Sequence, residues 1–117
     1  MAKQKSRWHG IRFVAFPSEW FWGMIPEFLE LSPAARLTYF CIKSAYIPGK
    51  YGDPGNNGQI GFSFAALKKG SGFSSDMTIW KAIEELEKKG WIFRKKKGGL
   101  FRGPNKYEIT GKYDPCV

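Results

Sequence analysis

The side chains most suited to binding chemistry are six cations near the end of the chain: Arg94, Lys95, Lys96, Lys97, Arg102 and Lys106. Guanidinium and ammonium groups bind phosphate oxygens, so a cluster of them suits a polyanion. The alternative is a basic surface turn that contacts only water, which is the usual fate of an isolated charge run. Few acidic residues stand nearby in the sequence to pair with these cations, and we therefore favour the binding interpretation.

The charge is distributed unevenly along the chain. The 117 residues carry a net charge of +9, with +4 over residues 1–12, −1 over residues 13–58 and +7 over residues 59–112. Two basic segments around a nearly neutral middle indicate a localised positive field, which suits nucleic acid first and an anionic membrane surface second. No apolar run is long enough to span a bilayer, so we expect no membrane insertion.

Residues for other kinds of chemistry are scarce. His9 is the only histidine, and Cys41 and Cys116 form neither a CxxC pair nor a disulfide framework. A histidine base and a His/Cys zinc site are therefore nearly excluded. The sequence contains no P-loop, no GxGxxG before a helix and no HExxH, so we predict no enzymatic activity, no cofactor and no metal ligand. The cysteine usage and the lack of an apolar signal segment favour a reduced, cytoplasmic setting.

A short helix and a glycine break come first among the elements that must position the basic run. Ser63 is placed to cap a helix over residues 64–69, with Leu67 on its apolar side. Gly70 and Gly72 then predict a tight break in the chain. A short extended piece at Ile60 precedes this helix.

A longer helix follows the break. Ser75 is a natural N-cap, Asp76 places negative charge in the first turn, and Gly90 suits the position just past the helix end. One face carries an apolar stripe that we expect to be buried: Ile79, Ala82, Ile83 and Leu86. Helical geometry then turns another set of side chains away from the core: Met77, Trp80, Lys81 and Glu84.

A third helix is predicted upstream, in LSPAARLTYFCIKSAY. Ser32 is its expected N-cap and Pro33 its first helical residue, and the chain leaves the helix by Pro48 and Gly49. The spacing of apolar residues predicts a core face made of Leu37, Phe40, Cys41 and Ala45.

The N-terminal segment is rich in aromatic residues. Residues 11–16 favour a short strand, residues 17–23 a helical turn that Ser18 is available to cap, and residues 25–30 a short helix. A basic arm, residues 1–12, precedes them. Such an arm either follows a nucleic-acid backbone or is a solubilising tail.

Residues 91–110 predict two strands joined by a glycine-rich connection. Ile92 and Ile109 are expected in the core. Because side chains alternate along a strand, we expect only about half of the run Arg94–Lys97 to touch one ligand.

This order of elements, together with its motifs, resembles the winged helix-turn-helix family. The matching pattern covers residues 59–110 and includes Ser-x-x-Thr at Ser75 and Thr78, the apolar stripe, and Gly-x-Ile at Gly90 and Ile92. The segments LSPAARLTYF and GQIGFS are also similar to the N-terminal domain of plasmid and phage replication initiators. The resemblance implies an α+β fold with a three-helix core, a C-terminal β-hairpin wing and an N-terminal extension.

The resemblance also implies an organisation of the chain. A basic flexible arm, residues 1–12, would precede a single winged-helix domain, residues 13–117. The helix-turn-helix would occupy about 63–89 and the wing about 91–110. In this family the second helix of the motif enters the major groove with its N-terminal end on base edges.

Carried over to this chain, the groove-reading end comprises seven residues: Ser74, Ser75, Asp76, Met77, Thr78, Trp80 and Lys81. With the six cations of the wing they form the candidate DNA-binding set. The hydroxyl groups and free N–H groups at the helix start suit phosphate, and Lys81 suits phosphate or a guanine edge.

Three residues on this helix depart from a typical DNA-binding face. Asp76 and Glu84 repel phosphate, although a carboxylate can accept a hydrogen bond from cytosine N4. Trp80 is large for a groove-reading position. It either contacts a thymine methyl or a sugar, or it is buried against the aromatic segment Trp20–Trp22 or in a dimer contact.

We therefore expect double-stranded DNA binding in replication initiation or transcriptional regulation of a plasmid, phage or bacterial element, with the protein cytoplasmic and associated with the nucleoid. The expected partners are DNA, a second copy of the chain, or a replication or transcription protein. Two alternatives remain open. One is a protein-interaction module that uses exposed aromatic residues such as Trp20, Trp22 and Trp80, with acids such as Glu85 and Glu87 in support, and the other is RNA binding.

Overall fold

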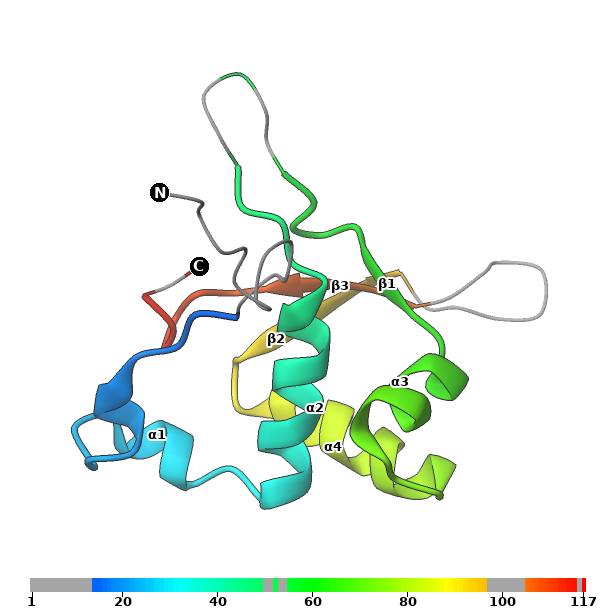
Figure 1. Cartoon of the computed structure of the whole chain (residues 1–117), viewed down its shortest axis with the longest axis horizontal. Coiled ribbons are helices and arrows are strands. Elements are labelled where there is room, and N and C mark those ends of the chain that lie inside the picture. The colour runs from blue at the N-terminus through cyan, green and yellow to red at the C-terminus, as the bar shows by residue number, and fades with distance from the viewer. Residues whose placement is uncertain (1–13, 50–51, 53–54, 97–104, 116) are drawn as a thin grey trace, which may run out of the picture.

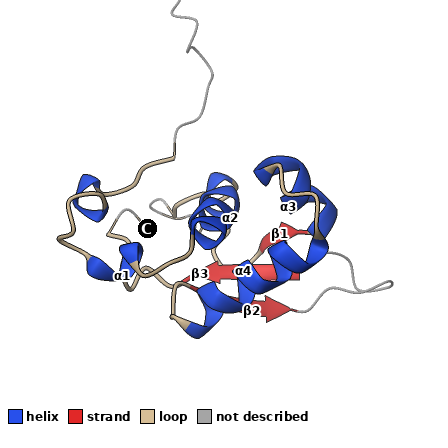
Figure 2. Ribbon diagram, turned by 90° about the horizontal axis from the view of Figure 1, so that it is seen from below, coloured by secondary structure: helices blue, strands red, loops and turns tan. Residues whose placement is uncertain are grey.

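Short helices and a small antiparallel sheet form a mixed α+β fold. The computed structural model describes residues 14–49, 52, 55–96, 105–115 and 117. Helices α2, α3 and α4 lie on one side of the strands (Figure 1; Figure 2). Within the described residues the elements are η1 (Ser18–Trp20), α1 (Pro26–Leu29), α2 (Pro33–Ser44), β1 (Ile60–Phe62), α3 (Phe64–Ser71), α4 (Asp76–Lys88), β2 (Ile92–Lys96) and β3 (Asn105–Ile109).

The strands form an antiparallel sheet in the order β1-β3-β2. Ile60 pairs with Tyr107, and Ile92 pairs with Ile109, so these four side chains share the buried face of the sheet. The hairpin and the core positions Ile92 and Ile109 were predicted correctly. The sequence showed an extended piece at Ile60 but not its pairing with β3, because that pairing joins residues far apart in the chain.

The predicted N-caps of α3 and α4 are confirmed. Ser63 Oγ accepts a hydrogen bond from the Ala66 N–H at 3.1 Å, and Ser75 Oγ accepts one from the Met77 N–H at 3.1 Å. Gly72 ends α3 with φ +81°, a left-handed conformation that glycine adopts without a steric penalty. Gly70, by contrast, lies inside α3, so the break that we expected at both glycines occurs only at the second.

Helix α2 begins as predicted but presents a different face to the core. Ser32 Oγ accepts a hydrogen bond from the Ala35 N–H at 3.2 Å. The predicted core residue Leu37 is 38% exposed, whereas the fully buried apolar side chains are Ala35, Tyr39 and Ile42. Three other predicted positions lie at the edge of the core: Phe40, Cys41 and Ala45. The helix is rotated in this way because Tyr39 packs edge-on against two buried tryptophans, Trp20 and Trp91, with centroid distances of 6.1 and 5.2 Å.

The N-terminal segment corrects two predictions. Residues 14–16 form no strand, and residues 11–13 lie outside the described residues. The helical turn exists as η1, but its N-cap is Pro17 and Ser18 provides no capping hydrogen bond. The short helix expected over residues 25–30 is confirmed as α1.

A buried polar cluster, which the sequence did not reveal, joins the two ends of the described chain to α2. Lys43 Nζ lies 2.6 Å from Asp114 Oδ2, and both side chains are almost fully buried. Lys43 also donates to the Ala15 carbonyl, and the Tyr39 hydroxyl donates to Asp114. Removing one partner would leave the other charge buried without compensation.

In the described part of the chain, no helix is both long enough and apolar enough to cross a bilayer.

Candidate nucleic-acid interface

The N-terminal half of α4 displays the side chains that the helical period predicted. Ile79, Ala82 and Ile83 are buried, while Met77 and Lys81 on the other face are exposed. Three residues at the helix start are also exposed, namely Ser74, Ser75 and Asp76, and Thr78 is half-buried. The seven residues expected at the groove-reading end are therefore brought together around the first turns of one helix.

Trp80 lies on this exposed half. Its side chain is 42% exposed and lines a shallow apolar depression of about 330 Å³ together with Phe64, Asp76 and Met77. The alternative that Trp80 is buried against the aromatic segment Trp20–Trp22 is wrong, because Trp80 is 42% exposed and Trp20 packs in the core beside Trp91. Trp80 is accordingly free for contact with a ligand or a partner.

The negative charge at the start of α4 is compensated. Asp76 Oδ1 lies 2.8 Å from Lys68 Nζ of α3. This ion pair reduces the repulsion that a lone carboxylate would exert on phosphate. Within the part of the chain that the structure describes, Lys69 and Lys81 have no carboxylate oxygen within ion-pairing distance. The α3–α4 corner thus carries cations whose charge is available to a ligand.

The C-terminal half of α4 makes structural contacts instead. Glu85 accepts hydrogen bonds from the Ser32 N–H at 2.7 Å and the Ser32 hydroxyl at 2.8 Å, so it holds the start of α2. Lys89 donates to the Glu30 carbonyl at 2.7 Å and lies 3.4 Å from Glu85. Burial alone would raise the pKa of Glu85, but the hydrogen bonds from Ser32 and the charge of Lys89 lower it below its ordinary value. The protein-interaction alternative assumed that Glu85 belongs to a free acidic surface. The contacts with Ser32 and Lys89 show that it does not.

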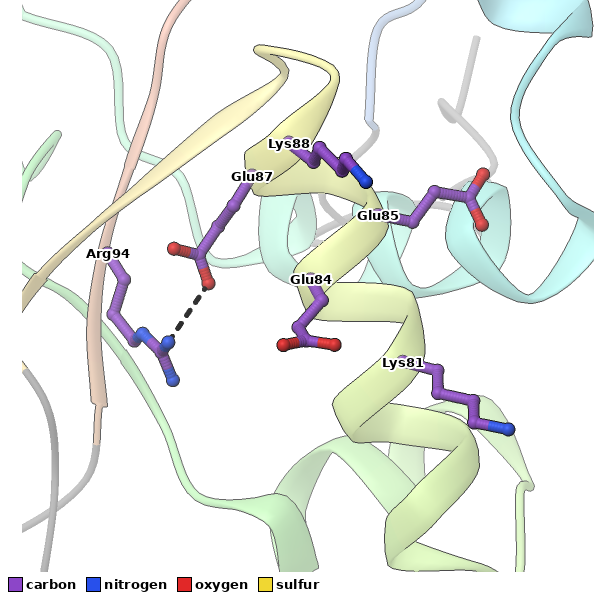
Figure 3. Close-up of a pocket in the computed structure, with 6 residues that line it drawn as sticks. All are labelled: Lys81, Glu84, Glu85, Glu87, Lys88 and Arg94. Carbon is purple, nitrogen blue, oxygen red and sulfur yellow. Dashed lines mark ion pairs between the residues drawn. The ribbon is translucent and has the colours of Figure 1, made fainter.

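Arg94 faces α4 from strand β2. Its guanidinium Nη2 lies 3.4 Å from Glu87 Oε1 (Figure 3). The pair sits in an open hollow of about 580 Å³ whose lining carries both signs of charge: Lys81, Glu84, Glu85, Glu87, Lys88 and Arg94. Arg94 is consequently a paired cation, which corrects the expectation that the basic run lacked acidic neighbours.

The next residue, Lys95, points to the opposite side of the sheet. Lys95 Nζ lies 3.3 Å from Glu108 and 5.4 Å from the centroid of the Phe93 ring. A second hollow of about 500 Å³, which we call the sheet hollow, is lined on this outer side by Asn57, Gly58, Gln59, Lys95, Lys106 and Glu108. The predicted division of the basic run between two faces is confirmed for Arg94 and Lys95.

Several predicted site residues lie outside the described residues, namely Lys97, Arg102 and the basic arm 1–12. Lys96 is the last residue of β2. Among the described residues, no group of three His, Cys, Asp or Glu side chains is arranged to hold a metal ion.

Comparisons of the chain with family models, with curated proteins and with solved structures gave no match. The resemblance to winged helices therefore depends on the motifs of this sequence. The function has to be argued from the exposed half of α4, the α3 lysines and the hairpin.

Proposed function

We propose that the chain is a winged-helix protein that binds double-stranded DNA, with the N-terminal half of α4 in the major groove. It acts without catalysis and without a cofactor. The observation that carries the proposal is the contrast on α4 itself, where Ile79 and Ile83 are buried while Met77, Trp80 and Lys81 are exposed beside the lysines of α3. An exposed helix with cations at its N-terminal end suits a groove lined by phosphates.

The packing around α4 supports this arrangement. A tight glycine turn connects α3 to α4, and both helices contact α2, as the helices of a helix-turn-helix do. The β2–β3 hairpin follows α4 directly and packs beside it (Figure 2). On binding, Arg94 on the helix side of the hairpin would exchange Glu87 for a backbone phosphate. The hairpin would thus act as a wing along the edge of the groove.

The biological role that we propose follows the resemblance of the sequence to replication initiators. The protein would act in replication initiation or transcriptional regulation of a plasmid, phage or bacterial element, in the cytoplasm and at the nucleoid. A palindromic site would require a dimer, because the symmetry of the site mirrors that of the protein.

The direct test is binding of the full chain to a random-sequence duplex, followed by fluorescence anisotropy across a salt series. If about four phosphates are neutralised, log K falls with log salt at a slope of roughly −4. Single-stranded DNA and a structured RNA of equal length are the comparison ligands. Failure to bind duplex at low salt overturns the proposal, and tighter binding to the RNA would favour the RNA alternative.

A protein partner on the same helix is the second candidate function. The apolar depression at Phe64, Met77 and Trp80 favours it, because exposed aromatic and methionine side chains are typical of protein interfaces. The Trp80→Ala and Lys81→Ala variants separate the two functions. DNA binding predicts that the loss of the Lys81 charge weakens duplex affinity, and equal affinity in the Lys81 variant would leave the partner surface as the better explanation.

A further inference from the structure

An acidic and aromatic protrusion stands apart from the rest of this basic protein. We define the aromatic protrusion as residues 18–30, which contain η1 and α1. Trp22 is 79% exposed and Met24 is 72% exposed, with Phe21 and Leu29 about half exposed beside them. The segment carries three carboxylates and no lysine or arginine, namely Glu19, Glu27 and Glu30.

The exposed side chains are displayed on a well-anchored base. Trp20 is fully buried, stacks on Phe28 at 4.7 Å and donates from Nε1 to the Tyr113 carbonyl at 3.0 Å. The tip is closed by backbone hydrogen bonds from Trp22 and Met24 to the Glu19 carbonyl, at 3.3 and 3.1 Å. A surface that is ordered before binding loses less conformational entropy when it docks, so this tip is suited to recognition.

We propose that the aromatic protrusion of one copy docks into the sheet hollow of a second copy, with Trp22 as the anchor. The hollow has a volume of about 500 Å³ and an exposed aromatic ring, Phe93, at its side. Lys95 and Lys106 line it and offer cation–π contacts to an indole ring. Glu108, already held by Lys95, accepts from the indole N–H, which is the one donor that a buried tryptophan must satisfy.

Charge complementarity selects the second copy and this orientation. Every charged side chain of the protrusion itself is a carboxylate, while Arg36 and Lys89 beside it donate to backbone carbonyls of residues 28–30. A symmetric contact between two protrusions would bring their carboxylates together. The lysines of the sheet hollow instead face Glu19, Glu27 and Glu30 of the partner. The α3–α4 corner also combines apolar and basic side chains, but the proposed function occupies it with DNA and makes no use of the outer side of the sheet.

The two surfaces lie at different ends of the molecule. Helix α1 is at one end of the long axis, and the ends of β2 and β3 that carry Lys95 and Lys106 point toward the other (Figure 1; Figure 2). One copy cannot satisfy both surfaces by itself. A head-to-tail contact of this kind builds a ring where its rotation closes and an open chain where it does not.

Sedimentation velocity of the full chain without DNA tests the contact. The average mass should rise above 13.3 kDa with concentration and fall again as salt is added. Trp22→Ser and Phe93→Ser should each weaken association on the order of thirtyfold, as expected for an interface anchor. Leu37→Ser, an exposed apolar position of α2 outside both surfaces, is the matched control and should associate like the wild type.

Mixing the two variants distinguishes a head-to-tail contact from a symmetric one. The Trp22→Ser chain keeps its sheet hollow, and the Phe93→Ser chain keeps its protrusion. An equimolar mixture should therefore form a heterodimer that stops at two copies, at concentrations where each variant alone is a monomer. Circular dichroism confirms that each variant is folded.

Three results would overturn the proposal: a wild-type chain that stays monomeric, association that survives Trp22→Ser, or a mixture that remains monomeric. Because no DNA is present, the outcome is independent of duplex binding. The self-association and the proposed DNA function can thus fail separately.

Discussion

The two halves of α4 belong to one continuous helix but have different roles in the structure. The first half, Asp76–Lys81, exposes Met77, Trp80 and Lys81, and Lys81 has no carboxylate partner among the described residues. The second half, Ala82–Lys88, uses Glu85 to hold the start of α2 and Glu87 to meet Arg94. Both halves bury one apolar face in the same core.

The difference shows why charge and exposure alone do not identify a binding residue. A side chain that satisfies a backbone N–H of a neighbouring helix has a structural role, and its removal costs stability. A side chain with the same charge that touches only solvent has no such cost. Substitutions in the two halves should therefore separate stability from binding.

The largest effect is expected for Glu85→Ala. This change removes two charge-assisted hydrogen bonds and leaves the Ser32 N–H without a partner, so the free energy of unfolding should fall by about 2 kcal/mol. Urea denaturation at neutral pH measures it. Glu84→Ala is the matched control, because Glu84 is the exposed neighbour on the same helix, and its effect should be within about 0.5 kcal/mol. Equal losses in the two variants would remove the structural role of Glu85.

The pH dependence of the free energy of unfolding is a second test of the structural role of Glu85. The pKa of Glu85 is lower in the folded chain than in the unfolded chain, where it has its ordinary value near 4.5. The carboxylate therefore contributes its full stability above pH 4.5, and this contribution is lost as the pH falls through the folded pKa. The Glu85→Gln variant keeps the shape of the side chain but has no carboxyl group to titrate. The stability gap between wild type and variant, about 1 kcal/mol at pH 7, should narrow as the pH falls below 4.5 and through the folded pKa of Glu85. A gap that is constant with pH would contradict the prediction.

Alanine variants of Lys81 and Lys88 compare how much each half of α4 contributes to duplex affinity. The two residues are of the same type, seven positions apart on one side of the helix, and both are exposed (Figure 3). Lys81→Ala should weaken duplex binding about fivefold and reduce the salt slope by about 1. Lys88→Ala should change affinity less than Lys81→Ala does, since Lys88 lies about 10 Å farther along the helix from the N-terminal end that the proposal puts in the groove. A larger loss for Lys88 would move the interface toward the C-terminal half.

Local chemistry allowed the sequence to predict most of the elements. Each of these signals acts on residues only a few positions away, so the sequence alone reveals it. They are the caps at Ser32, Ser63 and Ser75, the glycine after α4 and the apolar stripe of α4. The exposed set Met77, Trp80 and Lys81 followed from the stripe by helical geometry alone.

The contacts that decide between structural and functional roles are long-range, and the sequence did not reveal them. Glu85 meets Ser32 across 53 positions, and Tyr39 meets Asp114 across 75. The rotation of α2 away from the predicted Leu37 face has the same origin, because it depends on the packing of Trp20 and Trp91. The pairing of Arg94 with Glu87 was also hidden, since it requires the position of β2 beside α4.

Glu87→Gln is expected to have the smallest effect and tests the boundary between the two halves. Glu87 Oε1 is buried without a hydrogen bond among the described residues, and its distance of 3.4 Å from Arg94 is long for a strong pair. The pair therefore stabilises the fold little, and the free energy of unfolding should change by less than about 0.5 kcal/mol. Loss of the carboxylate frees the guanidinium for phosphate and removes a negative charge near the groove.

Duplex affinity of Glu87→Gln should accordingly rise about twofold to threefold at low salt, with a salt slope steeper by up to about 0.9. Anisotropy titrations of this variant beside Glu84→Gln measure both quantities. The Glu84 variant removes the same charge from the same helix but frees no arginine, so its affinity should rise while its slope stays unchanged. If the slopes of the two variants agree, Arg94 does not reach the DNA, and the helix side of the hairpin is a structural contact like the second half of α4.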